Sequence, residues 1–313
     1  MSSDDVDPRA TTLAAVAAGA GDAARTLTDH SRAVRARDPS RDDLVGECYA
    51  HFRIERPIGH GGMGAVYLAT DVALDRSVAL KVLGREISDD PLSRDRFVRE
   101  ARAQARINHP NICHIYFIGE QHGRLFFAME LVEGESLQQR IDRTGPLALR
   151  EAVELARMAA AGLAEAQKYG FTHRDVKPSN LLLDKHGVLK VADFGLVDTT
   201  ARDDGDERSG AIVGTPRYMA PEQARGEPVD FRADMYALGV TLHHLVDGAP
   251  PFAGETTTAL LAQHAAETRP RFARQASSAL EALCDRLMAK QPAERFGSYE
   301  ELLASLERAR GES

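Results

Sequence analysis

The sequence predicts an α+β protein in which a small β-rich lobe precedes a larger α-helical lobe. Between residues 52 and 132, runs of β-branched and aromatic residues alternate with Gly-containing turns, a pattern typical of antiparallel strands. Beyond Gly134 the apolar residues recur at helical spacing. In the segment 149–170, for example, one face carries Leu149, Val153, Ala156, Ala160 and Leu163.

The first lobe is expected to hold five strands and one helix, and the second lobe mainly helices. The strands are predicted at 52–59, 64–72, 76–83, 112–120 and 124–132, and the helix at 90–107. The main helices of the second lobe are predicted at 149–170, 234–246, 256–266, 277–289 and 299–310. No internal repeat is visible.

Residues 1–51 precede the first expected strand and are rich in Ala, Asp and Arg, with almost no aromatic side chains. Such a segment has too little apolar surface to close a core of its own. We therefore predict a flexible N-terminal extension, with a docking or regulatory segment as the alternative.

Composition narrows the class of protein. The net charge of −8 leaves no basic surface that would favour nucleic acid as a partner. No stretch reaches the roughly 20 apolar residues that span a bilayer, and the acidic start of the chain is unlike a signal peptide. Three widely spaced cysteines form neither a disulfide framework nor a zinc site. We expect a soluble, cytoplasmic protein with no membrane segment in this chain.

The stretch "IGHGGMGAV" has the pattern G-x-G-x-x-G-x-V, with Gly59, Gly61 and Gly64 at its glycine positions. Glycines in such a turn allow backbone N–H groups to close over phosphates. A dinucleotide-binding turn shares the pattern but should open a helix, whereas residues 65–68 continue as a strand. The pattern favours a phosphate-binding loop, and a simple turn remains the alternative.

Lys81 lies in "VALK", among apolar residues of strand type. A lysine there is costly to bury unless it has a charged partner. Glu100, within the expected helix, is a candidate partner. A lysine on an edge strand that faces water is the alternative.

The stretch "GFTHRDVKPSN" places a polar cluster between a helix and an apolar run, with "DFG" further along the chain. Asn180 and Asp193 flank the short hairpin "LLLDKHGVLKVA", which would bring their oxygen atoms to one point. Oxygen ligands of this kind suit Mg²⁺ held with nucleotide phosphates. Taken alone, a short cluster of this kind is more often a polar turn.

Together these motifs resemble those of the protein kinases, and most closely the bacterial serine/threonine kinases. "VALK" and "HRDVKPSN" each differ by one residue from the family pattern, at Leu80 and Val176, and A-P-E follows at 220–222. The resemblance covers residues 52–309, about four fifths of the chain. It implies the bilobal protein-kinase fold, with an N-lobe at 52–132, a C-lobe at 133–309 and a tail at 310–313.

The resemblance implies that the protein transfers the γ-phosphoryl group of ATP to protein substrates with Mg²⁺. Asp175 would accept or orient the substrate hydroxyl, and Lys177 would neutralise charge on the γ-phosphate. Lys81, held by Glu100, would bind the α- and β-phosphates. Asn180 and Asp193 would bind Mg²⁺. The nucleotide would contact Ile58, Gly59, His60, Gly61, Gly62, Met63, Gly64, Val66, Ala79, Lys81, Met129, Glu130, Val132 and Leu182.

The resemblance also implies serine/threonine specificity and an activation loop. Lys177 and Thr215 stand where serine/threonine kinases carry them. The segment 198–215 would be the activation loop, and we expect autophosphorylation at Ser209, Thr199 or Thr200. Arg174 would be the cationic partner of that phosphate. Autophosphorylation would involve self-association of the chain; ordering of the loop by substrate alone is the alternative.

Glu222, Arg295 and Asp234 are expected to support the site rather than to react, and Gln104 departs from the family pattern. Glu222 should pair with Arg295, and Asp234 should anchor the catalytic segment. Gln104 stands where many kinases have an apolar residue, and we expect a polar residue there to loosen the active position of its helix.

Two other functions stay open at this point. A pseudokinase or nucleotide-binding scaffold would share the fold, although Lys81, Asp175 and Asp193 are all present. A small-molecule phosphotransferase would generally lack the A-P-E and "GTPRY" segments. Many bacterial kinases have a transmembrane helix after the catalytic domain, so the chain is either a complete soluble kinase or a piece of a longer membrane-anchored one.

Overall fold

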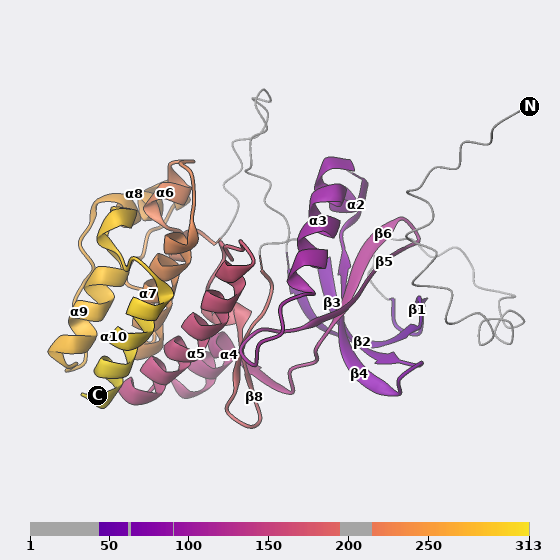
Figure 1. Ribbon diagram of the computed structural model, residues 1–313, viewed down its shortest axis with the longest axis horizontal. Coiled ribbons are helices and arrows are strands. Elements are labelled where there is room, and N and C mark those ends of the chain that lie inside the picture. The colour runs from indigo at the N-terminus through magenta and orange to yellow at the C-terminus, as the bar shows by residue number, and fades with distance from the viewer. Residues whose placement is uncertain (1–43, 62–63, 90, 195–214, 313) are drawn as a thin grey trace, which may run out of the picture. The chain divides into compact units, whose positions relative to one another are not determined.

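The computed structural model of the protein describes residues 44–61, 64–89, 91–194 and 215–312. From Val45 onward these residues belong to one structural unit. They form a six-stranded sheet, a three-stranded sheet and a group of helices (Figure 1). The predicted α+β fold class, with a β-rich first lobe and a helical second lobe, is confirmed.

A six-stranded antiparallel sheet dominates the first lobe, in the order β1-β2-β3-β4-β6-β5. Burial alternates along β3, as expected for a strand with one face on the core. The last six residues of β4 are all buried, so both faces of that strand are covered. The strands are β1 (Cys48–Tyr49), β2 (Phe52–Gly61), β3 (Gly64–Asp71), β4 (Arg76–Leu83), β5 (Ile115–Gln121) and β6 (Arg124–Met129).

Two helices follow β4: α2 (Arg85–Asp89) and α3 (Pro91–Gln104). Proline is favoured at the first position of a helix, where its missing N–H is not needed. The α3 helix contacts β5, and it buries Phe97 and Ala101, one turn apart. The Phe97 ring lies 5.8 Å from that of Phe127 on β6, which holds α3 against the sheet.

The second lobe combines a small antiparallel sheet, in the order β7-β8-β9, with helices. Its strands are β7 (Gly134–Ser136), β8 (Leu181–Asp184) and β9 (Leu189–Val191). Its α-helices are α4 (Leu137–Thr144), α5 (Leu149–Lys168), α6 (Pro221–Ala224), α7 (Phe231–Asp247), α8 (Thr257–Ala266), α9 (Ser278–Leu287) and α10 (Tyr299–Gly311). Short 3-10 helices are η2 (Pro178–Asn180), η3 (Pro216–Tyr218) and η4 (Pro292–Glu294).

The α7 helix is the centre of the helical lobe. Every residue from Ala233 to Val246 is buried, as expected for a helix covered on all sides. It contacts α5 and α9, and α10 contacts α5 and α9 in turn (Figure 1). No helix in the described part of the chain is both long and apolar enough to cross a membrane.

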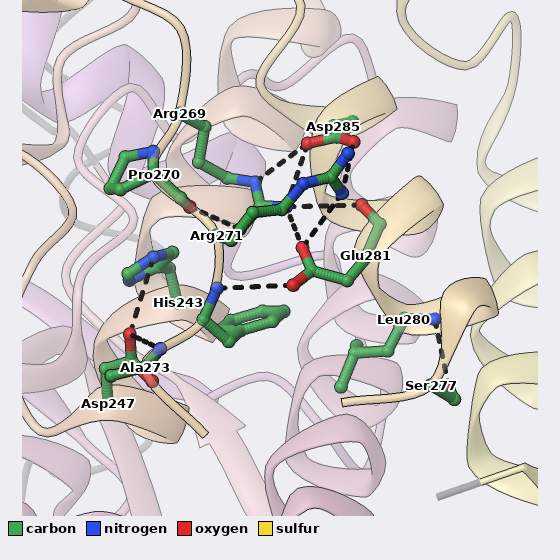
Figure 2. Close-up of polar contacts among 11 residues, drawn as sticks. His243, Asp247, Arg269, Pro270, Arg271, Ala273, Ser277, Leu280, Glu281 and Asp285 are labelled. Atoms are coloured by element: carbon green, nitrogen blue, oxygen red, sulfur yellow. Dashed lines mark hydrogen bonds and ion pairs between the residues drawn. The ribbon is translucent and has the colours of Figure 1, made fainter. Parts of the chain in front are cut away.

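The segment between α8 and α9 is held by a network of charged side chains (Figure 2). The buried Arg269 donates to both Glu281 and Asp285, and its Nη2 lies 2.8 Å from the Asp285 Oδ1 atom. Arg271 donates to the other Asp285 oxygen at 3.1 Å, and the Phe272 N–H donates to Glu281 at 3.2 Å. Paired carboxylates on α9 therefore compensate for the burial of the Arg269 guanidinium.

The structure differs from the predicted elements at several places; α2, α6 and β7, for example, were not predicted. The first sheet begins at β1, inside the segment 1–51 that was predicted to be flexible, because Cys48 and Tyr49 pair with β2. The α4 helix was not predicted. The α10 helix continues to Gly311, two residues beyond the predicted end of the domain at 309. Residues 1–43 lie outside the described part of the chain.

His264 on α8 is fully buried between helices. Its Nδ1 lies 2.9 Å from the hydroxyl of Tyr236 on α7, and its Nε2 has no hydrogen-bond partner among the described residues. Burial, together with the nearby charge of Lys290, lowers the pKa of His264 to about 4. The imidazole is therefore neutral in the folded protein near pH 7.

We predict that His264→Gln reduces the dependence of stability on pH. Between pH 6.5 and about 4 the unfolded chain binds the proton that folded His264 refuses, so stability falls as the pH drops through this window. Removing the imidazole should shrink the difference in unfolding free energy between pH 7 and pH 5 by about 2 kcal/mol.

Urea denaturation at the two pH values measures this difference. His186→Gln, in an exposed turn, is the matched control and should behave like the wild type. A His264→Gln protein with the full pH dependence of the wild type would contradict the buried, neutral state of this histidine.

Candidate active site

The segment between α5 and β8 is held by one buried carboxylate. The consecutive N–H groups of His173 and Arg174 each donate to Asp234 on α7, both at 2.7 Å. Burial raises the pKa of Asp234, and these two hydrogen bonds and the positive charge of Arg174 oppose that rise. The prediction that Asp234 anchors this segment is confirmed.

The polar cluster that follows is closely connected. The Lys177 Nζ lies 2.6 Å from the Asp175 Oδ2 and 2.6 Å from the Thr215 Oγ1. The Asn180 Nδ2 donates to the Asp175 main-chain oxygen at 2.8 Å and to its Oδ2 at 3.0 Å. The carboxylate of Asp175 is therefore oriented from two sides, by an ammonium and by an amide.

A hairpin brings a second carboxylate to this cluster. The β8 and β9 strands pair in register at Leu181 and Val191, and the Ala192 N–H donates to the Asn180 main-chain oxygen at 2.9 Å. Asn180 and Asp193 therefore lie at the same end of the hairpin, as the sequence predicted. The Asn180 Nδ2 faces Asp175, and its Oδ1 accepts a hydrogen bond from the Ser179 hydroxyl at 3.5 Å. This oxygen and the Asp193 carboxylate are of the hard type that Mg²⁺ prefers.

Lys81 reaches the same point from β4 in the first lobe. Its Nζ donates to the Asp193 Oδ1 at 2.6 Å, and its side chain is 11% exposed. Asp193 has a φ of 55°, in the left-handed region that is uncommon outside glycine. The expected partner, Glu100, belongs to α3, but its side chain lies outside the described part of the structure.

His173 links the Asp175 segment to the segment that leads into Asp193, a role that was not predicted from the sequence. Its Nδ1 accepts the Asp175 N–H at 3.2 Å, so its Nε2 carries a proton and donates to the Ala192 oxygen at 2.9 Å. Its ring lies 4.6 Å from that of the buried Phe194. This one imidazole therefore ties Asp175 to the backbone just before Asp193.

Most of the apolar residues expected to contact the nucleotide belong to one apolar cluster or pack against it. Ala79 and Met129 are directly paired across β4 and β6, and both belong to its buried core. Val66, Val132 and Leu182 pack against the same cluster from the two lobes. The remaining expected residue, Ile58, is 41% exposed on β2. Glu130 follows β6, and its N–H donates to the His114 oxygen at 2.9 Å.

The glycine-rich stretch forms the end of the β2–β3 hairpin. Gly59, His60 and Gly61 pair with Val66, Ala65 and Gly64. Gly64 has a φ of 144°, and a Cβ there would lie 2.2 Å from the Val82 main-chain oxygen, so only glycine fits. Gly62 and Met63, at the turn, lie outside the described residues.

The remaining predicted residues fall into two groups. Glu222 and Arg295 form a buried, two-pronged ion pair with N–O distances of 2.6 and 2.8 Å, as the sequence predicted. The expected phosphorylation sites Thr199, Thr200 and Ser209 lie outside the described residues.

Comparison with known proteins decides the family. The family described as "Protein kinase domain" matches residues 52–305, more than half of the chain. The chain belongs to the protein kinase family.

Two curated relatives of this kinase domain come from bacteria. It is 39% identical over 285 residues to the serine/threonine-protein kinase pkn3 of Myxococcus xanthus, a match that covers 87% of this chain and 52% of pkn3. It is 40% identical over 258 residues to PknB of Mycolicibacterium smegmatis, covering 80% of this chain and 41% of PknB. The chain thus spans about half, or less, of the length of these relatives.

Solved kinase domains have the same fold. The crystal structure of the PknI kinase domain from M. tuberculosis matches with a TM-score of 0.68 at 31% identity. The match covers 85% of this chain and 98% of that chain. The resemblance to bacterial serine/threonine kinases is confirmed.

Gln104, the last residue of α3, is buried next to the site. It is 3% exposed, and its Oε1 has no hydrogen-bond partner in the described part of the chain. Phe97 and Ala101 on the same helix belong to the apolar cluster that includes Ala192, the residue before Asp193. An unpaired buried oxygen costs about 1–3 kcal/mol, so the end of α3 is held less firmly than an apolar residue would hold it.

We predict that Gln104→Leu stabilises the kinase and raises its basal activity. Leucine has a similar volume and removes the unpaired oxygen, so the free energy of unfolding should rise by about 1–2 kcal/mol. The basal phosphorylation rate should increase because α3 would be held more firmly beside the Lys81–Asp193 pair.

Urea denaturation and a steady-state kinase assay measure these two effects. Gln275→Leu makes the same chemical change at an exposed position and is the control. An unchanged or lower basal rate in Gln104→Leu, with normal folding, would contradict the role of Gln104.

Proposed function

We propose that this kinase domain transfers the γ-phosphoryl group of ATP to serine or threonine hydroxyls of protein substrates, with Mg²⁺. The observation that carries the proposal is the contact cluster of Asp175, Lys177, Asn180, Asp193 and Lys81, drawn from both lobes. Phosphoryl transfer needs alignment and charge neutralisation more than covalent help from the protein, and this cluster offers both.

Each residue of the cluster has a distinct task in this proposal. The Asp175 carboxylate accepts a hydrogen bond from the attacking hydroxyl and orients it toward the γ-phosphorus. Lys177, 2.6 Å from Asp175, neutralises charge on the γ-phosphate as the bond to the leaving oxygen breaks. Lys81 binds the α- and β-phosphates beside Asp193. Asn180 and Asp193 hold Mg²⁺, which supplies further neutralisation of phosphate charge when bound.

The contact between Lys177 and Thr215 supports serine/threonine specificity. Lys177 bridges the Asp175 carboxylate and the hydroxyl of Thr215, the residue directly before η3. The named curated relatives are serine/threonine-protein kinases. The identity of the protein substrate depends on surfaces outside this cluster. ATP as a substrate favours a cytosolic location for the domain.

We predict that Asp175→Asn lowers kcat by about 10²–10⁴-fold, the usual contribution of a positioned acid–base group. The amide cannot accept the hydroxyl proton, while the residues proposed to bind ATP are unchanged. The KM for ATP should therefore stay close to the wild-type value. A radioactive-phosphate assay on protein and small-molecule acceptors measures both constants.

Asp75→Asn is the matched control, because it makes the same change in an exposed turn with a φ of 50° that asparagine tolerates. A folded Asp175→Asn protein with wild-type kcat would contradict the role of Asp175. If the wild type itself bound ATP but phosphorylated no protein, the nucleotide-binding scaffold would be the better reading.

We also propose that the kinase phosphorylates its own activation loop at Ser209, Thr199 or Thr200, and that the reaction occurs between two copies of the chain. A phosphate on the loop would have the guanidinium of Arg174 as a cationic group near the catalytic segment. The Arg174 N–H is fixed by Asp234, so the position from which its side chain extends is defined.

We expect mass spectrometry of the protein incubated with Mg-ATP to detect phosphate within residues 198–215. If the reaction occurs between copies, the initial rate per chain should rise with protein concentration, and an Asp175→Asn chain should be phosphorylated only when wild-type protein is added. A fully active enzyme with an unmodified loop would refute the proposal.

A further inference from the structure

Lys290, between α9 and η4, differs from every other lysine of the chain. The sequence contains six lysines, and all of them lie within the described residues. Five have a carboxylate oxygen within ion-pair distance, whereas Lys290 has none among the described residues. The five pairs are Lys81–Asp193, Lys168–Glu165, Lys177–Asp175, Lys185–Glu133 and Lys190–Glu130.

The amine of Lys290 faces aromatic rings instead. Its Nζ lies 4.8 Å from the centroid of the Phe252 ring and 5.6 Å from that of Tyr236 on α7. The one polar contact of this amine among the described residues is with the Tyr236 hydroxyl, at 3.4 Å. The side chain is only partly exposed. Two aromatic rings, one of which carries the hydroxyl, compensate an ammonium less completely than a carboxylate does.

The charged groups around Lys290 also favour its neutral amine over its ammonium form. Burial and the like charge of Arg295 lower the pKa of Lys290 to about 8, and Glu267 opposes this only in part. Arg295 cannot move away, because it is locked to Glu222. His264, on the far side of the Tyr236 hydroxyl, is neutral near pH 7.

Other lysines have the opposite environment. Hydrogen bonds from Lys168 to Glu165 and from Lys185 to Glu133 raise the pKa of each lysine. The ammonium form of these side chains is therefore favoured, and an ammonium is not a nucleophile. Lys290, by contrast, has aromatic rings in place of a carboxylate, so its ammonium loses a proton more easily. The residue is also partly exposed to solvent.

We propose that Lys290 is a site of covalent Nε-acylation and that small acyl phosphates are its acyl donors. The neutral amine attacks the carbonyl carbon of the donor, a C–N bond forms, and the C–O bond to phosphate breaks. Inorganic phosphate leaves, and the proton lost by the nitrogen goes to water. The step requires no oxidant, reductant or metal.

The charges around Lys290 favour the product. Acylation removes the positive charge beside Arg295, so the repulsion between the two side chains disappears. The amide N–H keeps a donor for the Tyr236 hydroxyl. The Glu222–Arg295 pair involves no atom of the Lys290 side chain. The modification therefore removes a repulsion without breaking this buried pair.

The expected selectivity follows from the neutral fraction of each amine. At pH 7.5 an amine with a pKa of about 8 is about one quarter neutral, whereas one near the usual 10.4 is about one part in a thousand neutral. Lower basicity also lowers nucleophilicity, as it does for thiols, and cancels roughly a factor of ten. Lys290 should therefore react at least about tenfold faster than Lys168 or Lys185.

Acetyl phosphate, added to the folded protein at a series of pH values, tests the proposal. Mass spectrometry of peptides cut at sites other than lysine gives the initial rate of acetylation for each of the six lysines. We expect Lys290 to react at least tenfold faster than Lys168 and Lys185 at pH 7.5, with half-maximal reactivity near pH 8. A rate at Lys290 no higher than at Lys185, or one that still rises tenfold between pH 9 and pH 10, would overturn the proposal.

Two controls separate the fold from the local sequence. In urea, where the rings and Arg295 no longer surround the amine, the preference for Lys290 should disappear; a preference that persists would refute the structural argument. Lys290→Arg keeps the charge but removes the amine, so acetylation summed over the lysines of the folded chain should drop sharply at pH 7.5, with the N-terminal amine counted separately. Unchanged lysine acetylation in this variant would count equally against the proposal.

Discussion

The two hydrogen bonds that Asp234 accepts from consecutive N–H groups determine the geometry of the candidate active site. A carboxylate buried in α7 is tolerated only when its oxygens are well satisfied, and each here receives a 2.7 Å bond, from His173 or Arg174. Arg174 has a φ of 65°, a strained conformation that persists because both N–H groups converge on one carboxylate. The direction of the chain into Asp175 follows from this turn.

His173 extends this constraint to the metal-binding side. One ring nitrogen receives the Asp175 N–H and the other donates to Ala192, so the Asp175 and Asp193 segments share a single rigid support. The Lys81–Asp193 contact then joins the first lobe to that support. The proposed catalytic groups come from three separate stretches of sequence, yet a short chain of hydrogen bonds and ion pairs connects each of them to Asp234.

The residues proposed to carry chemistry could be picked out from the sequence because they occur in short motifs with fixed spacing, as with Asn180 and Asp193, which flank one hairpin. The α4 helix was missed because it is short and polar, although Ser136 and Gln139 form a capping box that marks its start. The role of His173 could not be predicted, since it depends on Ala192 and on a carboxylate 61 positions away. Local patterns reveal which side chains are present, and only the tertiary contacts reveal which of them share a support.

The use of arginine and lysine in this chain follows the same distinction between support and chemistry. Arginine forms the buried structural pairs, at Arg295 with Glu222 and at Arg269 with Glu281, because a planar guanidinium can satisfy several acceptors at once. Lysine, a compact charge on a flexible stem, stands at the proposed phosphate site. Lys290 belongs to neither group, since its partners among the described residues are aromatic rings and the charge of Arg295, itself paired with Glu222, disfavours its ammonium form. Where a lysine lacks a carboxylate, its amine is left with the reactivity that ion pairing suppresses in the others.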